Sequence, residues 1–111
     1  MLTAKEKGLL LYIIDHCKRI EEKTENATSE SLYLDLDTTE IICFNLLQIG
    51  ELAKNLSNDF INKYNEVPWK SIKGMRDKIA HGYGTIDLDQ VWETATNDIK
   101  ALKEYCERII V

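Results

Sequence analysis

The sequence predicts an all-α fold, an antiparallel bundle of four main helices plus one short helix. Apolar residues recur at helical spacing through most of the chain, and a helix-start signal precedes each of these stretches. No segment alternates apolar and polar residues with the β-branched enrichment that a strand requires. The length of 111 residues suits one hydrophobic core, so we assign residues 1–111 to a single domain.

The first helix is predicted to start near Ala4. Thr3-Ala-Lys-Glu6 has the form of a capping box, in which the Thr and Glu side chains each accept a hydrogen bond from the other residue's backbone N–H. The polar segment from Glu21 to Ser31 should be a loop. The expected buried stripe of the helix consists of Leu9, Leu10, Ile13, Ile14, Cys17 and Ile20.

The second helix should start at Asp37-Thr-Thr-Glu40, a signal of similar logic, and continue to about Asn55. Gly50 lies inside it, and glycine costs a helix about 1 kcal/mol relative to alanine, which suggests close helix packing there. Ser57 is expected to cap a short helix through Phe60 to Lys63. The predicted inner face of the second helix consists of Ile42, Asn45, Leu46, Ile49, Leu52 and Ala53.

The next helix is predicted from Trp69 to Ala80. Pro68 precedes it, where a proline is compatible with the first helical turn, and Gly82 and Gly84 are stop signals. Asp87 or Asp89 should then cap the last helix. Its apolar period continues to the C-terminus through Val91, Ala95, Ile99, Leu102, Cys106 and Ile109.

Composition limits the classes of function. The chain is 44% hydrophobic and 30% charged, as expected for a soluble globular protein. No apolar run approaches the roughly 20 residues that span a bilayer, and the first residues lack the layout of a signal peptide. We therefore expect a cytoplasmic protein with no membrane association. The net charge of −5 argues against non-specific coating of nucleic acid.

No metal or cofactor is expected. Cys17, Cys43 and Cys106 are widely separated and form no CxxC pair, so buried reduced thiols are the prediction. The acidic segment from Asp35 to Leu46 starts like a calcium loop. It lacks the glycine and the final glutamate of an EF-hand, so its acids are better explained as helix-start charges.

The most informative segment is Met75-Arg-Asp-Lys-Ile-Ala-His-Gly-Tyr83. Arg76 and Tyr83 are close to two helical turns apart, whereas Arg76 and His81 point about 140° apart on an ideal helix. His81 would share a site with Arg76 only if the helix loosens near Gly82 or if a second copy of the chain faces it. Taken singly, the three side chains could equally be a surface ion pair, a helix cap and a boundary aromatic.

Around this segment basic residues outnumber acidic ones, although the chain as a whole is acidic. Lys73 and Lys78 flank the motif and are candidates to support it. Such a local basic face suits either a confined phosphate site or an acidic partner. Glu51 is either an ordinary solvated acid or a hydrogen-bond partner of the Arg76 region.

Arg76-x4-His81-x-Tyr83 resembles the RX4HXY signature of HEPN domains, specifically of the HepT-like toxins. Other landmarks of that family follow in order from residue 41 to the C-terminus. The chain departs from the family pattern at Phe44, where many members have Arg, and at Asp77, where Asn is common. The matching landmarks are Asn45-Leu-Leu-Gln-Ile-Gly-Glu-Leu-Ala53, Val67-Pro-Trp69, Gly74-Met-Arg76 and Val91-Trp-Glu93.

The resemblance implies a HEPN-like homodimer and a metal-independent endoribonuclease, the toxin of a toxin–antitoxin pair. His81 and its copy in the second chain would act as general acid and base, since His16 lies far away on the first helix. Arg76 would stabilise charge on the phosphate, and Asp77 would orient Arg76 or His81. Tyr83 would contact the phosphate or stack on a base.

The resemblance also implies a partner, a minimal nucleotidyltransferase antitoxin of the MNT type that adenylylates Tyr83 and so blocks RNA. Two alternatives stay open. The chain could be a non-catalytic docking subunit of a nucleotidyltransferase complex, which the acidic net charge and Phe44 favour. It could also be a plain helical dimerisation domain, if the motif is coincidental. The intact Arg76, His81 and Tyr83 favour the ribonuclease.

Overall fold

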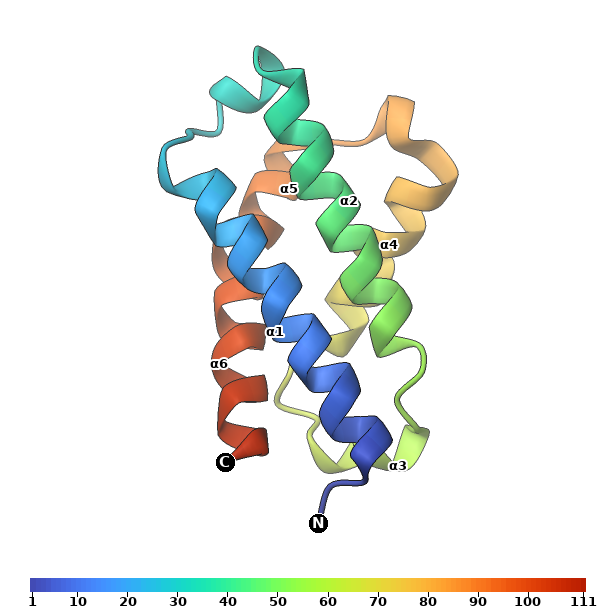
Figure 1. Ribbon diagram of the computed structural model, residues 1–111. Coiled ribbons are helices and arrows are strands. Elements are labelled where there is room, and N and C mark those ends of the chain that lie inside the picture. The colour runs from blue at the N-terminus through green and yellow to red at the C-terminus, as the bar shows by residue number, and fades with distance from the viewer.

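The computed structural model describes residues 1–111 and contains helices and no strand. The predicted bundle is confirmed: α1, α2, α4 and the last helical rod are its four main members, and α3 is the short one (Figure 1). A π-helical stretch, η3, joins α5 to α6 into that rod. The elements are α1 Ala4–Glu25, η1 Ser31–Tyr33, α2 Leu36–Ala53, α3 Asn58–Lys63, α4 Trp69–Gly82, η2 Tyr83–Thr85, α5 Leu88–Glu93, η3 Thr94–Asp98 and α6 Ile99–Ile110.

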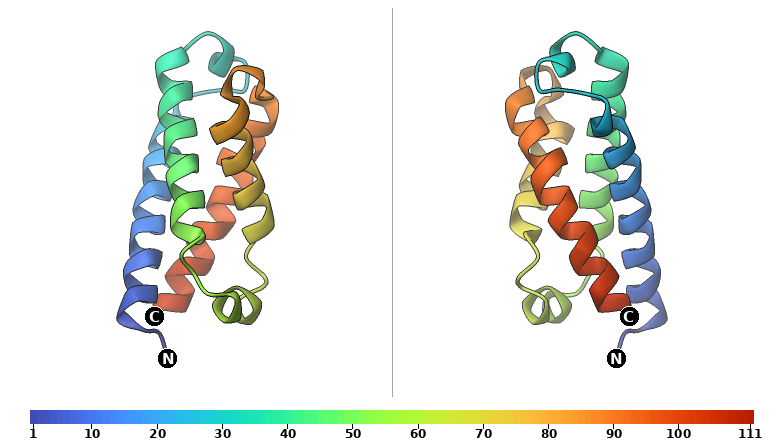
Figure 2. Two further views of the ribbon diagram at one scale, coloured as in Figure 1. Left: turned by 90° about the vertical axis from the view of Figure 1, so that its right-hand side faces the viewer. Right: turned by 90° about the vertical axis from the view of Figure 1, so that its left-hand side faces the viewer.

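The main helices alternate in direction along the bundle. α1 packs against both α2 and α6, and α2 also packs against α4. Both chain ends lie at one end of the bundle, near α3 (Figures 1 and 2). The C-terminal end of α4 lies at the opposite end of the bundle, where α2 begins (Figures 1 and 2). The segment from Arg76 to Tyr83 therefore approaches the end of the bundle that is remote from the termini.

The predicted apolar stripes form the core. Nearly all of the expected positions are buried, and Leu9, Leu52 and Ile109 are the ones that remain partly exposed. Burying a Leu or Ile side chain completely contributes about 1.5–3 kcal/mol relative to leaving it exposed. The side chains with no exposed surface include Leu10, Ile13, Ile20, Ile42, Ile49, Ile99 and Leu102.

Three of the predicted helix starts are confirmed by hydrogen bonds. Thr3 makes both bonds of the capping box with Glu6, at 2.9 and 3.0 Å. Ser57 accepts from the backbone N–H of Phe60. Asp87, one of the two candidates for the last helix, accepts from the backbone N–H of Asp89. Each cap satisfies a donor that the helix itself leaves unpaired.

The predicted start of the second helix at Asp37 is wrong by two residues. Asp35 is the cap: its carboxylate accepts from the backbone N–H and the hydroxyl of Thr38, at 3.2 and 2.7 Å. The backbone of Asp35 is still non-helical, whereas Asp37 already lies in the first turn. Its negative charge there faces the positive end of the helix dipole.

Two predicted helix ends are also wrong, because both helices continue further. α1 extends to Glu25, into the segment predicted as a loop. Glutamate and lysine are good helix formers, and Lys103 of α6 holds Glu21 with an ion pair of 2.6 Å. α4 likewise continues past Ala80 to Gly82.

The three cysteines are buried and free, as predicted. Burial raises the pKa of Cys43 to about 11 and that of Cys106 to about 12. Burial also raises the pKa of Cys17, helped by the nearby Cys106. No helix combines the length and the apolar character needed to cross a bilayer.

Candidate functional site

The motif helix α4 is held tightly against α2 at one point. A methyl group added to Gly50 of α2 would overlap Cβ and Cγ of Arg76. The close packing predicted at Gly50 is therefore confirmed, and the residue that it accommodates is the first member of the motif. The position of the Arg76 backbone is thus fixed by the packing of two helices.

The guanidinium of Arg76 is fixed by two carboxylates. Its Nε donates to Glu51 Oε1 at 2.5 Å, Nη2 forms an ion pair with the same oxygen, and Nη1 donates to Asp77 Oδ1 at 3.0 Å. These contacts with Asp77 and Glu51 raise the pKa of Arg76 above its usual value. Of the two alternatives for Glu51, the hydrogen-bond partner is the one observed. The Arg76 side chain is only 19% exposed, and the two carboxylates hold its guanidinium in position while compensating its charge.

Asp77 contacts Arg76, one of its two predicted targets. The structure shows no hydrogen bond between Asp77 and His81. Lys73, a candidate supporting residue, lies one turn before Asp77 on α4, is partly exposed and forms no ion pair. It therefore adds positive charge near Arg76 without holding its guanidinium.

Tyr83 follows α4 directly and lies beside α2. Its side chain is 40% exposed, and its hydroxyl makes no hydrogen bond within the chain. Partial burial raises the pKa of Tyr83, and Cys43 and Glu40 of α2 add to the effect. The hydroxyl is consequently neutral near pH 7 and accessible from solvent.

His81 lies on a different face of α4. It is exposed and lines a surface hollow to which neither Arg76 nor Tyr83 contributes. The helix does not loosen before Gly82, so His81 keeps its helical angle relative to Arg76. One chain therefore does not bring the two side chains into one pocket. The other residues lining this hollow are Lys78, Gly82, Thr85, Ile86, Asp87 and Gln90.

An exposed apolar surface lies on α2 near Tyr83. We call Ile41 and Phe44, which are 39% and 56% exposed, the α2 apolar face. Asp37 and Glu40 border it in a shallow hollow. From the sequence, Phe44 stood out only as a departure from a family pattern. The sequence did contain a signal for this exposed surface, because Ile41 and Phe44 are apolar yet fall outside the predicted buried stripe of α2.

A second polar feature links α1 to α2 within the bundle. His16 Nδ1 lies 2.7 Å from Asn45 Oδ1, and the Asn45 amide donates to the Ile41 carbonyl. Asn45 is buried, so this bond satisfies a polar group that would otherwise be costly to bury. His16 thus has a structural partner and lies apart from the motif.

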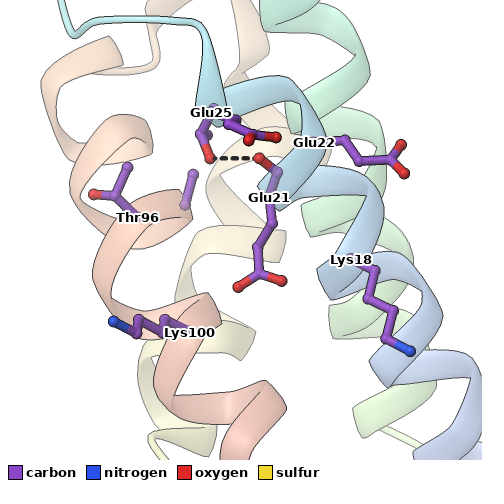
Figure 3. A pocket seen from close by; sticks show the side chains of 8 residues that line it. Lys18, Glu21, Glu22, Glu25, Thr96 and Lys100 are labelled. Carbon is purple, nitrogen blue, oxygen red and sulfur yellow. Dashed lines mark hydrogen bonds between the residues drawn. The ribbon is translucent and has the colours of Figure 1, made fainter.

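Another surface hollow lies between α1 and the last helical rod, away from the motif (Figure 3). Three glutamates of α1, Glu21, Glu22 and Glu25, line it together with Thr96 and Lys100 from the opposite helix. This hollow was not predicted from the sequence, because residues 21–31 were expected to form a loop. No histidine or cysteine lines it.

Comparison with known proteins gives a consistent family. A family model described as "Ribonuclease HepT-like" matches residues 13–109. A Methanocaldococcus jannaschii protein named as a "Putative RNase" is 36% identical, over 97% of this chain and 93% of its own. The "Probable ribonuclease HepT" of Thermococcus cleftensis is 35% identical, over 97% and 98%. No solved structure matches.

Proposed function

Because the chain belongs to the ribonuclease HepT-like family, we propose that it is a metal-independent endoribonuclease and the toxin of a toxin–antitoxin pair. The observation that carries the proposal is the arrangement at the end of α4. Arg76 is pre-positioned by Glu51 and Asp77, while His81 and Tyr83 are exposed and free of internal hydrogen bonds. RNA could contact each of these side chains from solvent, although one chain does not bring Arg76 and His81 into a single pocket.

The proposed reaction uses the ribose as its own nucleophile. One imidazole removes the proton of the 2′-hydroxyl, whose oxygen attacks the adjacent phosphorus. The bond from phosphorus to the 5′-oxygen breaks, and a second imidazolium protonates that leaving oxygen. The products are a 2′,3′-cyclic phosphate and a 5′-hydroxyl. Histidine suits both steps because it titrates near neutral pH.

Arg76 would stabilise the negative charge that develops on the phosphate. Its guanidinium presents several donors, and Asp77, which holds Nη1, has a 64% exposed side chain. A phosphate oxygen arriving from solvent can therefore share or replace the contact with Asp77. The more enclosed contact with Glu51 would keep the guanidinium in position.

The proposed enzyme is a homodimer. Two imidazoles are needed, and each chain supplies only His81 at this end of the bundle. The separation of His81 from Arg76 within one chain supports a site completed by a second copy. The α2 apolar face offers a surface for that contact, since burying Phe44 and Ile41 would be favourable. A two-fold axis there would place both copies of the motif near one another.

The proposed antitoxin is a nucleotidyltransferase that transfers AMP to Tyr83. The Tyr83 oxygen would attack the α-phosphorus of ATP, pyrophosphate would leave, and the phenol proton would pass to a base of the partner enzyme. The exposed, unpaired hydroxyl of Tyr83 supports this target. The attached nucleotide would exclude RNA by its bulk and negative charge. Intact mass after co-expression would show a gain of one AMP, and Tyr83→Phe would abolish it.

The test of the ribonuclease compares the native chain with His81→Ala, in cells and in vitro. We expect growth arrest on induction without the partner, and cleavage of labelled RNA in the presence of EDTA, by the native form alone. His16→Asn, which removes the other histidine but keeps an amide nitrogen near the position of Nδ1, is the matched control and should behave like the native chain. Full cleavage by His81→Ala would contradict the proposal.

A docking subunit without cleavage of its own is the second candidate. The exposed Phe44, in place of a basic residue, and the net charge of −5 favour it. Under this alternative neither the native chain nor His81→Ala would arrest growth or cleave RNA. The native chain would still bind the nucleotidyltransferase.

A further inference from the structure

We propose that the hollow beside His81 is a second phosphate-binding subsite, in which Lys78 binds an RNA phosphate next to the one being cleaved. Gln90 is the residue that positions Lys78. The inference rests on the proposed ribonuclease function and extends it to residues outside the motif. Its basis is the juxtaposition of Lys78, His81 and Gln90 in one hollow.

The side chain of Lys78 is held by a neutral partner. Its Nζ donates to Gln90 Oε1 at 2.9 Å, and this bond links α4 to α5. Lys78 differs in this from the four basic side chains that are paired with carboxylates: Arg19 with Asp15, Lys54 with Glu51, Arg76 with Glu51 and Asp77, and Lys103 with Glu21. Lys78 is thus oriented while no ion pair compensates its charge. An ammonium in this state attracts a phosphate more strongly than one already paired.

The remaining groups of the hollow are compatible with an anion. Asp87 is its only acidic member, and its carboxylate caps α5 by accepting from the Asp89 backbone N–H. Its charge is therefore partly balanced by the helix terminus. The Thr85 hydroxyl donates to the Gly82 carbonyl, and the hydroxyl oxygen itself accepts no hydrogen bond within the chain. The amide nitrogen of Gln90 makes no hydrogen bond within the chain and can donate to a phosphate or ribose oxygen.

Which RNA phosphate Lys78 contacts follows from the hollow that it shares with His81. His81 must contact the ribose or the leaving oxygen of the cleaved bond, and Lys78 lies within the same hollow. Consecutive phosphates of a single strand are only a few ångströms apart, so the adjacent phosphate is the one Lys78 can reach. Lys78 would thereby fix the register of the RNA relative to the imidazole.

A purely structural explanation is that the bond between Lys78 and Gln90 only ties α4 to α5. Gln90→Glu separates the two explanations. A glutamate keeps the tether, as an ion pair, but it neutralises Lys78 and adds a negative charge to the hollow. A structural tether would survive this change, whereas phosphate binding would not.

The experiment measures binding of a short single-stranded 2′-O-methyl RNA, which lacks the attacking hydroxyl, across a range of KCl concentrations. We expect Lys78→Met to weaken binding about tenfold at low salt, the scale of one hydrogen bond to a charged group. The slope of log affinity against log salt should fall by about 0.7. Gln90→Glu should weaken binding similarly without lowering Tm. Lys100→Met, an equal charge change on α6, should match the native chain.

The outcomes separate this inference from the proposed function. Native affinity and salt slope in both Lys78→Met and Gln90→Glu would overturn the subsite, even if the native chain cleaves RNA. A Gln90→Glu chain that binds normally while Lys78→Met binds poorly and melts lower would assign a structural tether. Absence of cleavage of ordinary RNA by the native chain, with salt-dependent binding through Lys78 intact, would overturn the nuclease and the placement of this phosphate beside a cleaved one, but not the phosphate contact of Lys78. Absence of any RNA binding by the native chain would overturn both.

Discussion

Arg76 is positioned by its neighbours before any substrate arrives. Gly50 lets the α4 backbone approach α2, and Glu51, the next residue of α2, holds the guanidinium. Consecutive residues of one helix thus provide the space for Arg76 and its hydrogen-bond acceptor. Pre-positioning of this kind reduces the reorganisation needed when charge develops on a substrate.

Gly50→Ala should therefore destabilise the protein. The new methyl would overlap Arg76. The local shift of α2 against α4 that relieves this overlap should cost about 1–3 kcal/mol, as in other overpacked sites. We expect a lower Tm in calorimetry and weaker RNA cleavage. Gly8→Ala is the matched control, because a Cβ at Gly8 meets nothing within 4 Å. It should stabilise α1 by up to about 1 kcal/mol. Equal Tm changes would contradict the packing argument.

For single residues, the sequence identified the members of the motif but not which neighbours each of them contacts. The angle between Arg76 and His81 could be calculated, and α4 keeps it. Whether Glu51 was solvated or paired could not be decided, because that depends on the approach of α2 to α4. The pairing of Lys78 with Gln90 depends likewise on where α5 lies after the turn.

The helices were largely predictable as elements because their apolar period and their caps agreed. The errors lie at boundaries where tertiary contacts decide. α1 continues to Glu25 while Lys103 of α6 pairs with Glu21, a contact that residues of α1 alone do not reveal. The π-helical stretch Thr94–Asp98 had no signal in the pattern, since Ala95 and Ile99 also suit a regular helix. Near the start of α2 the chain has two aspartates, Asp35 and Asp37. Asp35 is the cap because it accepts the hydrogen bonds from Thr38.

The cap of α2 predicts a pH dependence. Hydrogen bonds from Thr38, first from its hydroxyl and then from its N–H, lower the pKa of Asp35. A carboxyl whose pKa is lower in the folded state stabilises the protein above its unfolded pKa of about 3.9. That stability is lost as the pH falls through the folded pKa. Asp35→Asn should lower Tm near pH 7, and the difference should start to shrink as the pH falls below about 4 and vanish only below the folded pKa of Asp35.

Asp37→Asn is the control for this experiment, because the Asp37 carboxylate accepts no hydrogen bond from the helix start. It should change Tm near pH 7 less than Asp35→Asn does. A larger effect at Asp37 would mean that the cap had been placed at the wrong aspartate.

In the folded molecule, Arg76 and His81 of the motif lie on two different faces of α4. The bundle fold, its single core and the place of the motif followed from sequence patterns. The exposure of Ile41 and Phe44 did not, because a pattern of buried positions does not show which outward residues another chain would cover. The α2 apolar face and the separation of His81 from Arg76 are properties of the assembled bundle.

Phe44→Glu should disrupt the proposed homodimer. A charge at this 56% exposed position would have to be desolvated in the contact, so we expect a monomer by sedimentation and at least a tenfold loss of RNA cleavage. Tyr12→Glu is the matched control, an aromatic of α1 that is 64% exposed. It should leave mass and cleavage unchanged. A dimeric, active Phe44→Glu chain would show that the copies meet elsewhere.

The three buried thiols give the chain a built-in reporter of its own opening. Each lies on a different main helix, α1, α2 or α6, and none is solvent-accessible in the folded bundle. A colorimetric disulfide reagent at pH 8 should therefore react slowly with the native chain. In guanidinium, which unfolds the chain, it should react rapidly with all three cysteines. If reaction follows rare opening events, its rate measures how often each helix leaves the bundle. Faster labelling of Cys43 than of Cys17 would show that α2 separates before the rest of the bundle opens.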